Sequence, residues 1–138
     1  MKPSNPAAAL YAFAGFAGMT SVALAAFGAH AVANLAPTGE RGAALFQQGT
    51  DFQLKHTLAL ILITMLADRV YPGMIRQTLW IAAGAMVIGI VLFPAALYAA
   101  AFDKPHFYAP WGGTAAMIGW LLFAVAGVMT LTLPDPVP

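Results

Sequence analysis

The chain has 138 residues, of which 61% are hydrophobic and 8% are charged, with a net charge of +1 and a mean hydropathy of +0.78. Soluble domains are typically near half apolar and a quarter charged, so this composition excludes an ordinary soluble fold. The near-neutral charge gives no reason to expect a nucleic-acid partner. The absence of cysteine removes disulfides, iron–sulfur clusters and cysteine-based zinc sites. We therefore expect a single all-α integral membrane domain over residues 1–138.

The first apolar segment, residues 7–33, carries no formal charge. A helix rises 1.5 Å per residue, so about 20 apolar residues cross a hydrocarbon core roughly 30 Å thick. The segment is also much longer than the roughly 7–15 apolar residues of a cleaved signal peptide, so we expect it to be retained. It is predicted to be the first transmembrane span.

Small side chains recur along this first span at four-residue spacing. In lipid, small residues let helix backbones approach closely, and packing replaces the hydrophobic effect as the source of association. This pattern predicts that the first span is the central helix against which the others pack. Its predicted packing residues are Ala17, Ser21, Ala25, Gly28, Ala29 and Ala33.

Three further spans are expected. A polar connection follows the first span, and residues 40–48 within it are expected to form a short interfacial helix. The second span is predicted at 52–70. Its uncharged core, 56–67, is short, but charged residues at its ends can snorkel to the membrane surface and so extend the length that crosses the bilayer. The third span is predicted at 78–101 and the fourth at 111–133. Small residues four apart predict close packing there too, in the pairs Ala85 and Gly89, and Ala115 and Gly119.

This pattern predicts four transmembrane helices in an up-down bundle with both termini on the same side of the membrane. Lys2, Arg69 and Arg76 then lie on the terminal side, and Arg41, Lys55 and Lys104 lie on the other. The compact turn between Arg69 and Arg76 favours cytoplasmic termini under the positive-inside rule. The expected location is a bacterial inner membrane.

All three histidines fall on one face of the four-span arrangement. His30 ends the first span, His56 begins the second, and His106 lies between the third and fourth. Asp51 is expected on the same face, and Tyr98 near it. Because histidine is the commonest metal ligand and titrates near neutral pH, this face is a candidate site for a metal, haem or a quinone head group.

The alternative is that these residues are structural or interfacial. Polar groups at helix ends commonly meet water, headgroups or backbone, and no single helix carries a metal-ligand spacing. A hydrogen bond within the bundle is the more typical role for Tyr98. The spans lack deep charges of the kind that proton relays and ion pathways use, which disfavours a pump or coupled transporter. Neither a phosphate-binding glycine loop nor a nucleophile elbow is present, so we expect no enzymatic activity, metal or cofactor.

Three stretches of the chain stand out together: 26–31 (AFGAHA), 46–60, and 110–113 (PWGG) with 118–120 (IGW). Together they resemble the YgdD-like family, also called the transmembrane protein 256 family. The segment 26–31 (AFGAHA) resembles the family's GAFGAHA signature, and 46–60, including the sequence HTLAL, resembles its second conserved region. The segments 110–113 (PWGG) and 118–120 (IGW) resemble its third. The resemblance covers residues 10 to 130. It implies a small multi-span membrane protein and carries no established activity.

The chain departs from the family pattern at two places. Phe52 and Gln53 stand where the family commonly has a tyrosine–histidine pair, so one potential ligand is absent. The run 93–98 (FPAALY) stands in place of a serine-rich FSGSLY-like run. Both changes replace polar groups with apolar ones or an amide, and they imply that any polar ligand of the family is bound less well here.

Two functional hypotheses follow. The first is a non-catalytic membrane protein that packs against other membrane proteins as an accessory or structural subunit of a larger complex, with the lipid bilayer as its other partner. The second is a protein that binds a metal, haem or a quinone at the histidine face. A channel or transporter ranks third, because the spans offer no polar pore lining.

Overall fold

A computed structural model describes residues 2–70 and 73–132 of the chain. Described residues form helices α1 (Asn5–Phe27), α2 (Ala33–Leu35), α3 (Gly39–Arg69), α4 (Met74–Ala101) and α5 (Ala109–Thr132), with a π-helical turn, η1 (Gly28–Val32), joining α1 to α2. The expected all-helical class is confirmed. Residue 133, the last of the predicted fourth span, lies outside the described residues.

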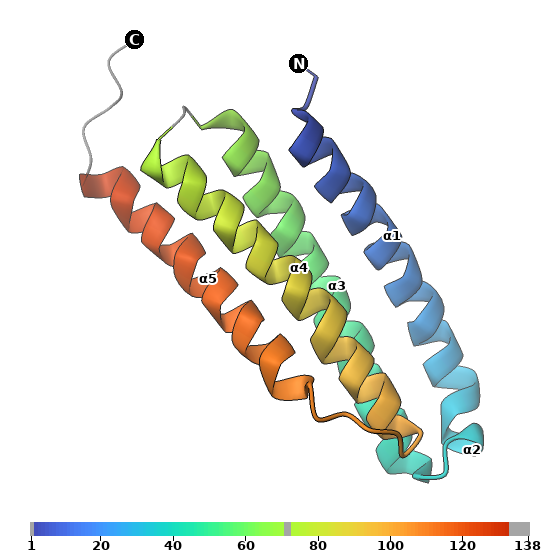
Figure 1. The fold of residues 1–138 in the computed structure, drawn as a ribbon. Coiled ribbons are helices and arrows are strands. Elements are labelled where there is room, and N and C mark those ends of the chain that lie inside the picture. Colours follow the sequence, from blue (N-terminus) through green and yellow to red (C-terminus); the bar gives the residue numbers. More distant parts are fainter. Residues whose placement is uncertain (1, 71–72, 133–138) are drawn as a thin grey trace.

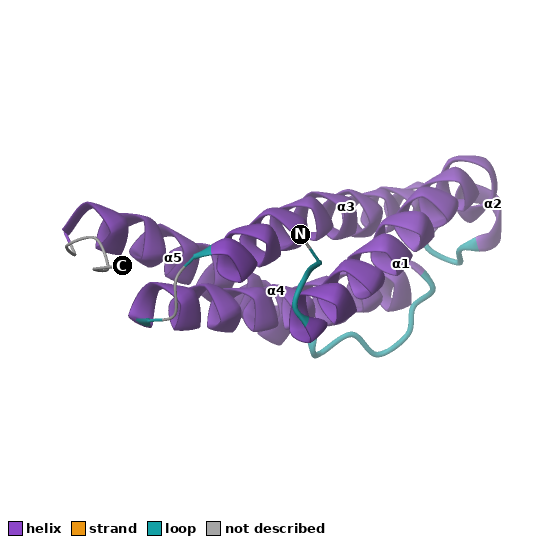
Figure 2. Cartoon of the chain, turned by 90° about the horizontal axis from the view of Figure 1, so that it is seen from above, coloured by secondary structure: helices purple, strands orange, loops and turns teal. Residues whose placement is uncertain are grey.

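The four long helices run antiparallel in the order α1, α3, α4, α5, so that the start of α1 and the end of α5 lie at the same end (Figures 1 and 2). Helix α1 packs mainly on α3, α3 on α4, and α4 on α5. The two middle positions are therefore held by α3 and α4. The expectation that the first span is the central helix was wrong.

The geometry of a helix explains this error. Each residue turns the helix by about 100°, so each four-residue step advances about 40° around the axis, and a ridge at that spacing winds away from a straight neighbour. Of the predicted packing residues on α1, Ala17 and Ser21 are buried, and the other buried residues of this helix are Ala7 and Ala14. Ala25 and Ala29 are exposed, and Gly28 is half-buried. The side chain of Ala33 lies outside the described part of the chain.

The predicted interfacial helix over 40–48 and the predicted second span over 52–70 are one helix, α3. With 31 residues it is about 46 Å long. Its buried positions recur in steps of four and three, which keeps one face towards its neighbours over many turns. These buried positions include Phe46, Thr50, Gln53, Thr57, Leu60, Thr64 and Ala67.

Small residues form the contact between α4 and α5. A Cβ added at Gly89 would lie 2.9 Å from the Cβ of Ala116, and one added at Gly119 would lie 3.1 Å from Met86 side-chain atoms. Ala85 and Ala115 are half-buried beside these contacts. Glycine is therefore needed at position 89 for α5 to lie this close to α4, whereas at position 119 a Cβ would require the Met86 side chain to shift by a few tenths of an ångström.

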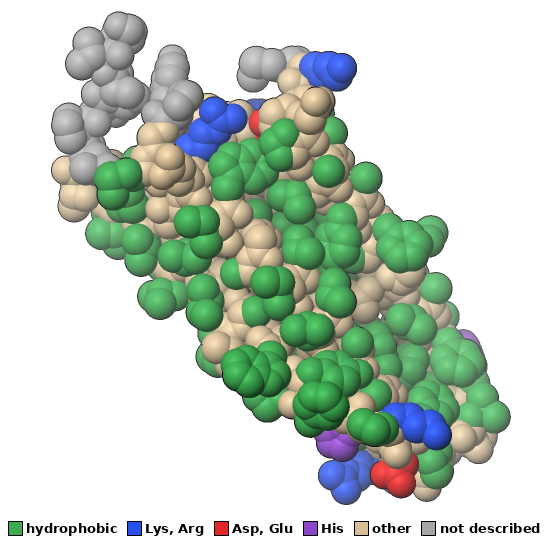
Figure 3. All heavy atoms as spheres, viewed as in Figure 1, with side chains coloured by type: hydrophobic (Ala, Val, Ile, Leu, Met, Phe, Trp, Pro, Cys, Tyr) green, Lys and Arg blue, Asp and Glu red, His purple; other side chains and the backbone are tan. Residues whose placement is uncertain are grey.

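Of the described residues, three stretches are long and apolar enough to cross a membrane: Asn5–Val32, Met74–Ala101 and Ala109–Thr132. Helix α3 is not among them: charged residues lie at both of its ends and also near its middle, at Asp51 and Lys55. Figure 3 shows hydrophobic side chains covering the middle of the visible face, with Lys, Arg, Asp and Glu gathered towards its two ends. This distribution is typical of a membrane-embedded molecule.

Candidate functional site

A buried polar cluster joins three helices in the half of the bundle that holds the connection between α1 and α3. Gln53 of α3 donates from Nε2 to the carbonyl of Ala17 at 2.8 Å and to Oγ1 of Thr20 at 2.9 Å, both on α1. Its Oε1 accepts from the hydroxyl of Tyr98 on α4 at 2.9 Å. The amide of Gln53 therefore uses both its nitrogen and its oxygen to hold α1 and α4 against α3.

A second hydrogen bond between α1 and α3 lies beside Gln53. The hydroxyl of Ser21 donates to the carbonyl of Thr50 at 2.9 Å, and both residues are buried. A buried polar group without a partner is costly in an apolar medium, so these paired groups fix how α1 sits along α3. Further along α3, the buried hydroxyls of Thr57 and Thr64 have no hydrogen-bond partner within the described residues.

Aromatic rings and glycines pack beside the cluster, towards the connection between α1 and α3. Phe46 lies 4.6 Å from the ring of Tyr98 and 5.9 Å from that of Phe27, centroid to centroid. A Cβ at Gly49 would lie 2.6 Å from the Tyr98 ring, and one at Gly28 would lie 2.9 Å from the Phe46 ring. These two glycines provide the space in which the rings pack.

The FGAH segment that resembles a family signature lies at the junction of α1 and η1. Turns of π-helix are rare and frequently occur at functional sites. A pocket of about 480 Å³ is lined by this junction and by the first turns of α3. Its polar lining comes from Glu40, Gln47, Thr50 and Asp51, and its apolar lining includes Gly28 and Phe46.

The predicted ligand face is only partly assembled. Asp51 and His56 line one pocket of about 410 Å³ on the outer side of α3. The His56 ring stacks on Phe52 at 3.7 Å, and its Nδ1 lies 2.8 Å from the Phe52 carbonyl. Trp120 of α5 packs on the same imidazole edge-on, at 6.1 Å. Asp51 also forms an exposed ion pair with Lys55, at 3.8 Å.

The other predicted ligand residues lie in different surroundings. His30 is exposed on η1, and His106 is exposed between α4 and α5, where its Nδ1 lies 2.9 Å from the Lys104 carbonyl. Tyr98 belongs to the buried cluster with Gln53. Among residues 2–70 and 73–132, no group of three or more His, Asp or Glu side chains could hold a metal ion.

Comparison with known proteins places the chain in a family. Residues 24–113 match the model of a protein family of unknown function, DUF423. The inner membrane protein YgdD of Escherichia coli K12 (UPF0382) is 31% identical over 121 residues, which cover 84% of this chain and 86% of YgdD. The chain belongs to the DUF423 family. The expected YgdD-like membership is confirmed.

Other DUF423 relatives show the same extent of similarity. The membrane protein YwdK of Bacillus subtilis 168 is 30% identical over 82% of this chain and 90% of YwdK. A UPF0382 membrane protein of Haemophilus influenzae is 29% identical over 84% of this chain and 90% of its own length. Together with the three apolar helices, these relatives identify a bacterial membrane protein. No solved structure matches the chain.

Gln53, the centre of the polar cluster, was missed as a site residue by sequence reasoning, which treated it only as a lost ligand. A signal was present: Thr50, Gln53, Thr57 and Thr64 share the four–three spacing of the buried face of α3. Polar residues on that face must meet neighbouring helices. The spacing could therefore have identified a buried polar face.

Proposed function

We propose that this DUF423 protein spans the bacterial inner membrane four times and acts without catalysis, as an accessory subunit that packs against other membrane proteins. The proposal rests on the exposure of the outer helices. In the most apolar 18-residue stretches of the first helix (Asn5–Val32) and of α5, only 17% of the residues are buried within the chain, compared with 44% for α4. Each outer helix leaves most of its apolar surface available to lipid or to another helix.

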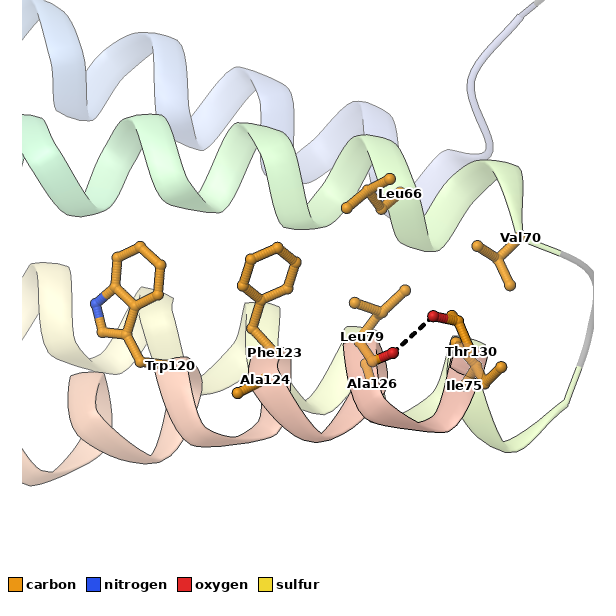
Figure 4. A pocket seen from close by; sticks show the side chains of 10 residues that line it. Leu66, Val70, Ile75, Leu79, Trp120, Phe123, Ala124, Ala126 and Thr130 are labelled. Atoms are coloured by element: carbon orange, nitrogen blue, oxygen red, sulfur yellow. Dashed lines mark hydrogen bonds between the residues drawn. The ribbon is translucent and has the colours of Figure 1, made fainter. Parts of the chain in front are cut away.

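The open side of α5 has the shape that a helix from another protein would fill. A groove of about 520 Å³ runs between α3 and α5 over α4, and almost all of its lining is apolar. Figure 4 shows the rings of Trp120 and Phe123 standing between α5 and α3, with Leu66 and Val70 on the α3 side. From Trp120 to Thr130 the groove extends about 15 Å along α5, which is about three helical turns. Ala124 and Gly127 give it a small-residue floor on α5, of the kind that favours helix association in lipid.

If the chain is a subunit of a complex, a partner protein should copurify with it in stoichiometric amount. A substitution that fills the groove should abolish this copurification. A Cβ at Gly127 meets no atom within 4 Å and Gly127 lines the groove, so we expect Gly127→Phe to place its ring in the groove. Gly84→Phe is the matched control, because a Cβ at Gly84 also meets no atom within 4 Å and Gly84 does not line the groove. After mild detergent extraction of the tagged chain from native membranes, mass spectrometry should find a partner with the wild type and with Gly84→Phe, and lose it with Gly127→Phe.

Recovery of the wild type as free monomer would contradict the subunit proposal. The same samples should be analysed for metal, haem and quinone. A free protein that carries one of these in stoichiometric amount, and loses it on His56→Ala, would instead support the second candidate function. That candidate is favoured by one observation, the stacked His56 ring and Asp51 in a common pocket.

Four spans predict that the two ends of α3 lie on opposite sides of the membrane. Because the chain has no cysteine, single substitutions can be labelled without background. A membrane-impermeant maleimide should label Glu40→Cys and Lys104→Cys from outside spheroplasts, and Met74→Cys only after permeabilisation, if the termini are cytoplasmic. Labelling of Glu40→Cys and Met74→Cys from the same side would show that α3 does not cross the bilayer.

A further inference from the structure

Basic side chains converge at the end of the molecule where α1 begins. A pocket of about 420 Å³ is lined there by Lys2, Arg69 and Arg76, together with Ser4, Tyr11 and Asp68. The residues come from the lead before α1, from α1 itself (Tyr11), from the last turn of α3 and from the first turn of α4. Figure 3 shows Lys and Arg side chains around a small acidic patch at this end.

The three cations are not neutralised by the one carboxylate of the pocket. Both oxygens of Asp68 lie 3.3 Å from the backbone nitrogen of Ser4, which donates to them. In the described part of the chain, the ion pair of Asp51 and Lys55, near the middle of α3, is the one contact within 4.0 Å between a basic and an acidic side chain. Arg69 and Arg76 therefore have donor capacity left for an anion from outside.

The surroundings of the pocket match the membrane surface. Helices α1 and α4 begin at this end and α3 ends there, so the partial charges of the helix termini partly cancel and the positive field comes from the three cations. Tyr11 and Arg76 are half-buried, and Trp80, one turn beyond Arg76 on the same side of α4, is half-buried too. Tyrosine and tryptophan at this depth are typical of the boundary between headgroups and acyl chains.

We propose that this basic pocket binds the phosphate headgroup of an anionic phospholipid. Arginine suits such a ligand, because its planar guanidinium donates two parallel hydrogen bonds to phosphate oxygens. Basic pockets between transmembrane helices are a recurrent form of headgroup site. The position of the pocket favours a lipid over a soluble anion, because the pocket lies next to the apolar surface of the helices. Its acyl chains would lie along the exposed apolar side chains of α1.

Native mass spectrometry of the detergent-purified full chain tests this assignment. With added phosphatidylglycerol or phosphatidylcholine, the wild type should bind the anionic lipid preferentially, and less strongly as salt increases. The double variant Arg69→Gln, Arg76→Gln should lose about thirtyfold in affinity for phosphatidylglycerol. The matched control is Arg41→Gln, Lys104→Gln, which removes two exposed cations from the opposite end and should change the affinity little.

Lys2→Gln is the milder variant, since Lys2 precedes α1 and its loss leaves every helix intact. It should lower the affinity about fivefold. Equal binding of the two lipids, or unchanged affinity in both pocket variants, would overturn the proposal. Displacement of phosphatidylglycerol by a small excess of inorganic phosphate would also overturn it, because the pocket would then recognise free phosphate. None of these outcomes depends on whether the chain has a protein partner.

Discussion

Replacing Gln53 by leucine is expected to lower the free energy of unfolding by about 2–3 kcal/mol, although leucine has a similar volume and suits an apolar interior. The change removes the three hydrogen bonds that Gln53 makes to Ala17, Thr20 and Tyr98. Hydrogen bonds between transmembrane helices contribute about 0.6 kcal/mol each on average and up to about 1.7. The larger total arises because the Tyr98 hydroxyl is left without its acceptor inside the bundle. Equilibrium unfolding in mixed micelles, followed by circular dichroism, measures the loss.

Gln48→Leu is the matched control for this prediction. It is the same substitution on the same helix, but Gln48 is exposed, so stability should change by no more than about 0.5 kcal/mol. A double-mutant cycle with Tyr98→Phe then isolates the single bond between Tyr98 and Gln53. We expect a coupling of about 0.6–1.7 kcal/mol. Additive effects would show that Tyr98 does not donate to Gln53.

The helical architecture could be predicted from the sequence because charge and hydropathy mark the ends of long helices. The expected division of α3 into an interfacial helix over 40–48 and a span over 52–70 was wrong, and Asp51 and Lys55 lie beside the expected boundary. In the structure both residues are exposed on an uninterrupted helix. Gly49 does not end this helix but packs against the Tyr98 ring. A charged pair on one face of a helix does not disturb the backbone, so it carries no information about where the helix ends.

The candidate site was less predictable, since it depends on which helix faces which. His56 was grouped with His30 and His106 because all three fall on one side of the membrane in a four-span arrangement. Membrane depth does not fix direction around a helix axis, and here the His56 ring points to Phe52 and Trp120. The position of Tyr98 opposite Gln53 likewise depends on the packing of α4 against α3, which no local pattern specifies.

Gly112→Ala is expected to destabilise the protein by about 2–3 kcal/mol, although it adds a single methyl group. A Cβ at Gly112 would overlap the backbone nitrogen of Phe93 and lie 2.9 Å from both the carbonyl carbon and the Cβ of Leu92. Backbone atoms within a helix cannot rotate away as the end of a side chain can, so α4 and α5 would have to separate. Overpacking of this kind typically costs about 1–3 kcal/mol.

The neighbouring residue provides the control, because Gly113 belongs to the same helix turn and the same PWGG sequence. A Cβ there would meet the Phe93 ring at 3.5 Å, an ordinary van der Waals distance. Gly113→Ala should therefore be neutral, or stabilise the chain by up to about 1 kcal/mol through the better helix propensity of alanine. Thermal unfolding in detergent should separate the two variants by several degrees. Equal thermal stability of the two variants would contradict the close approach of α5 to Phe93, and helix packing would then not explain the glycine at position 112.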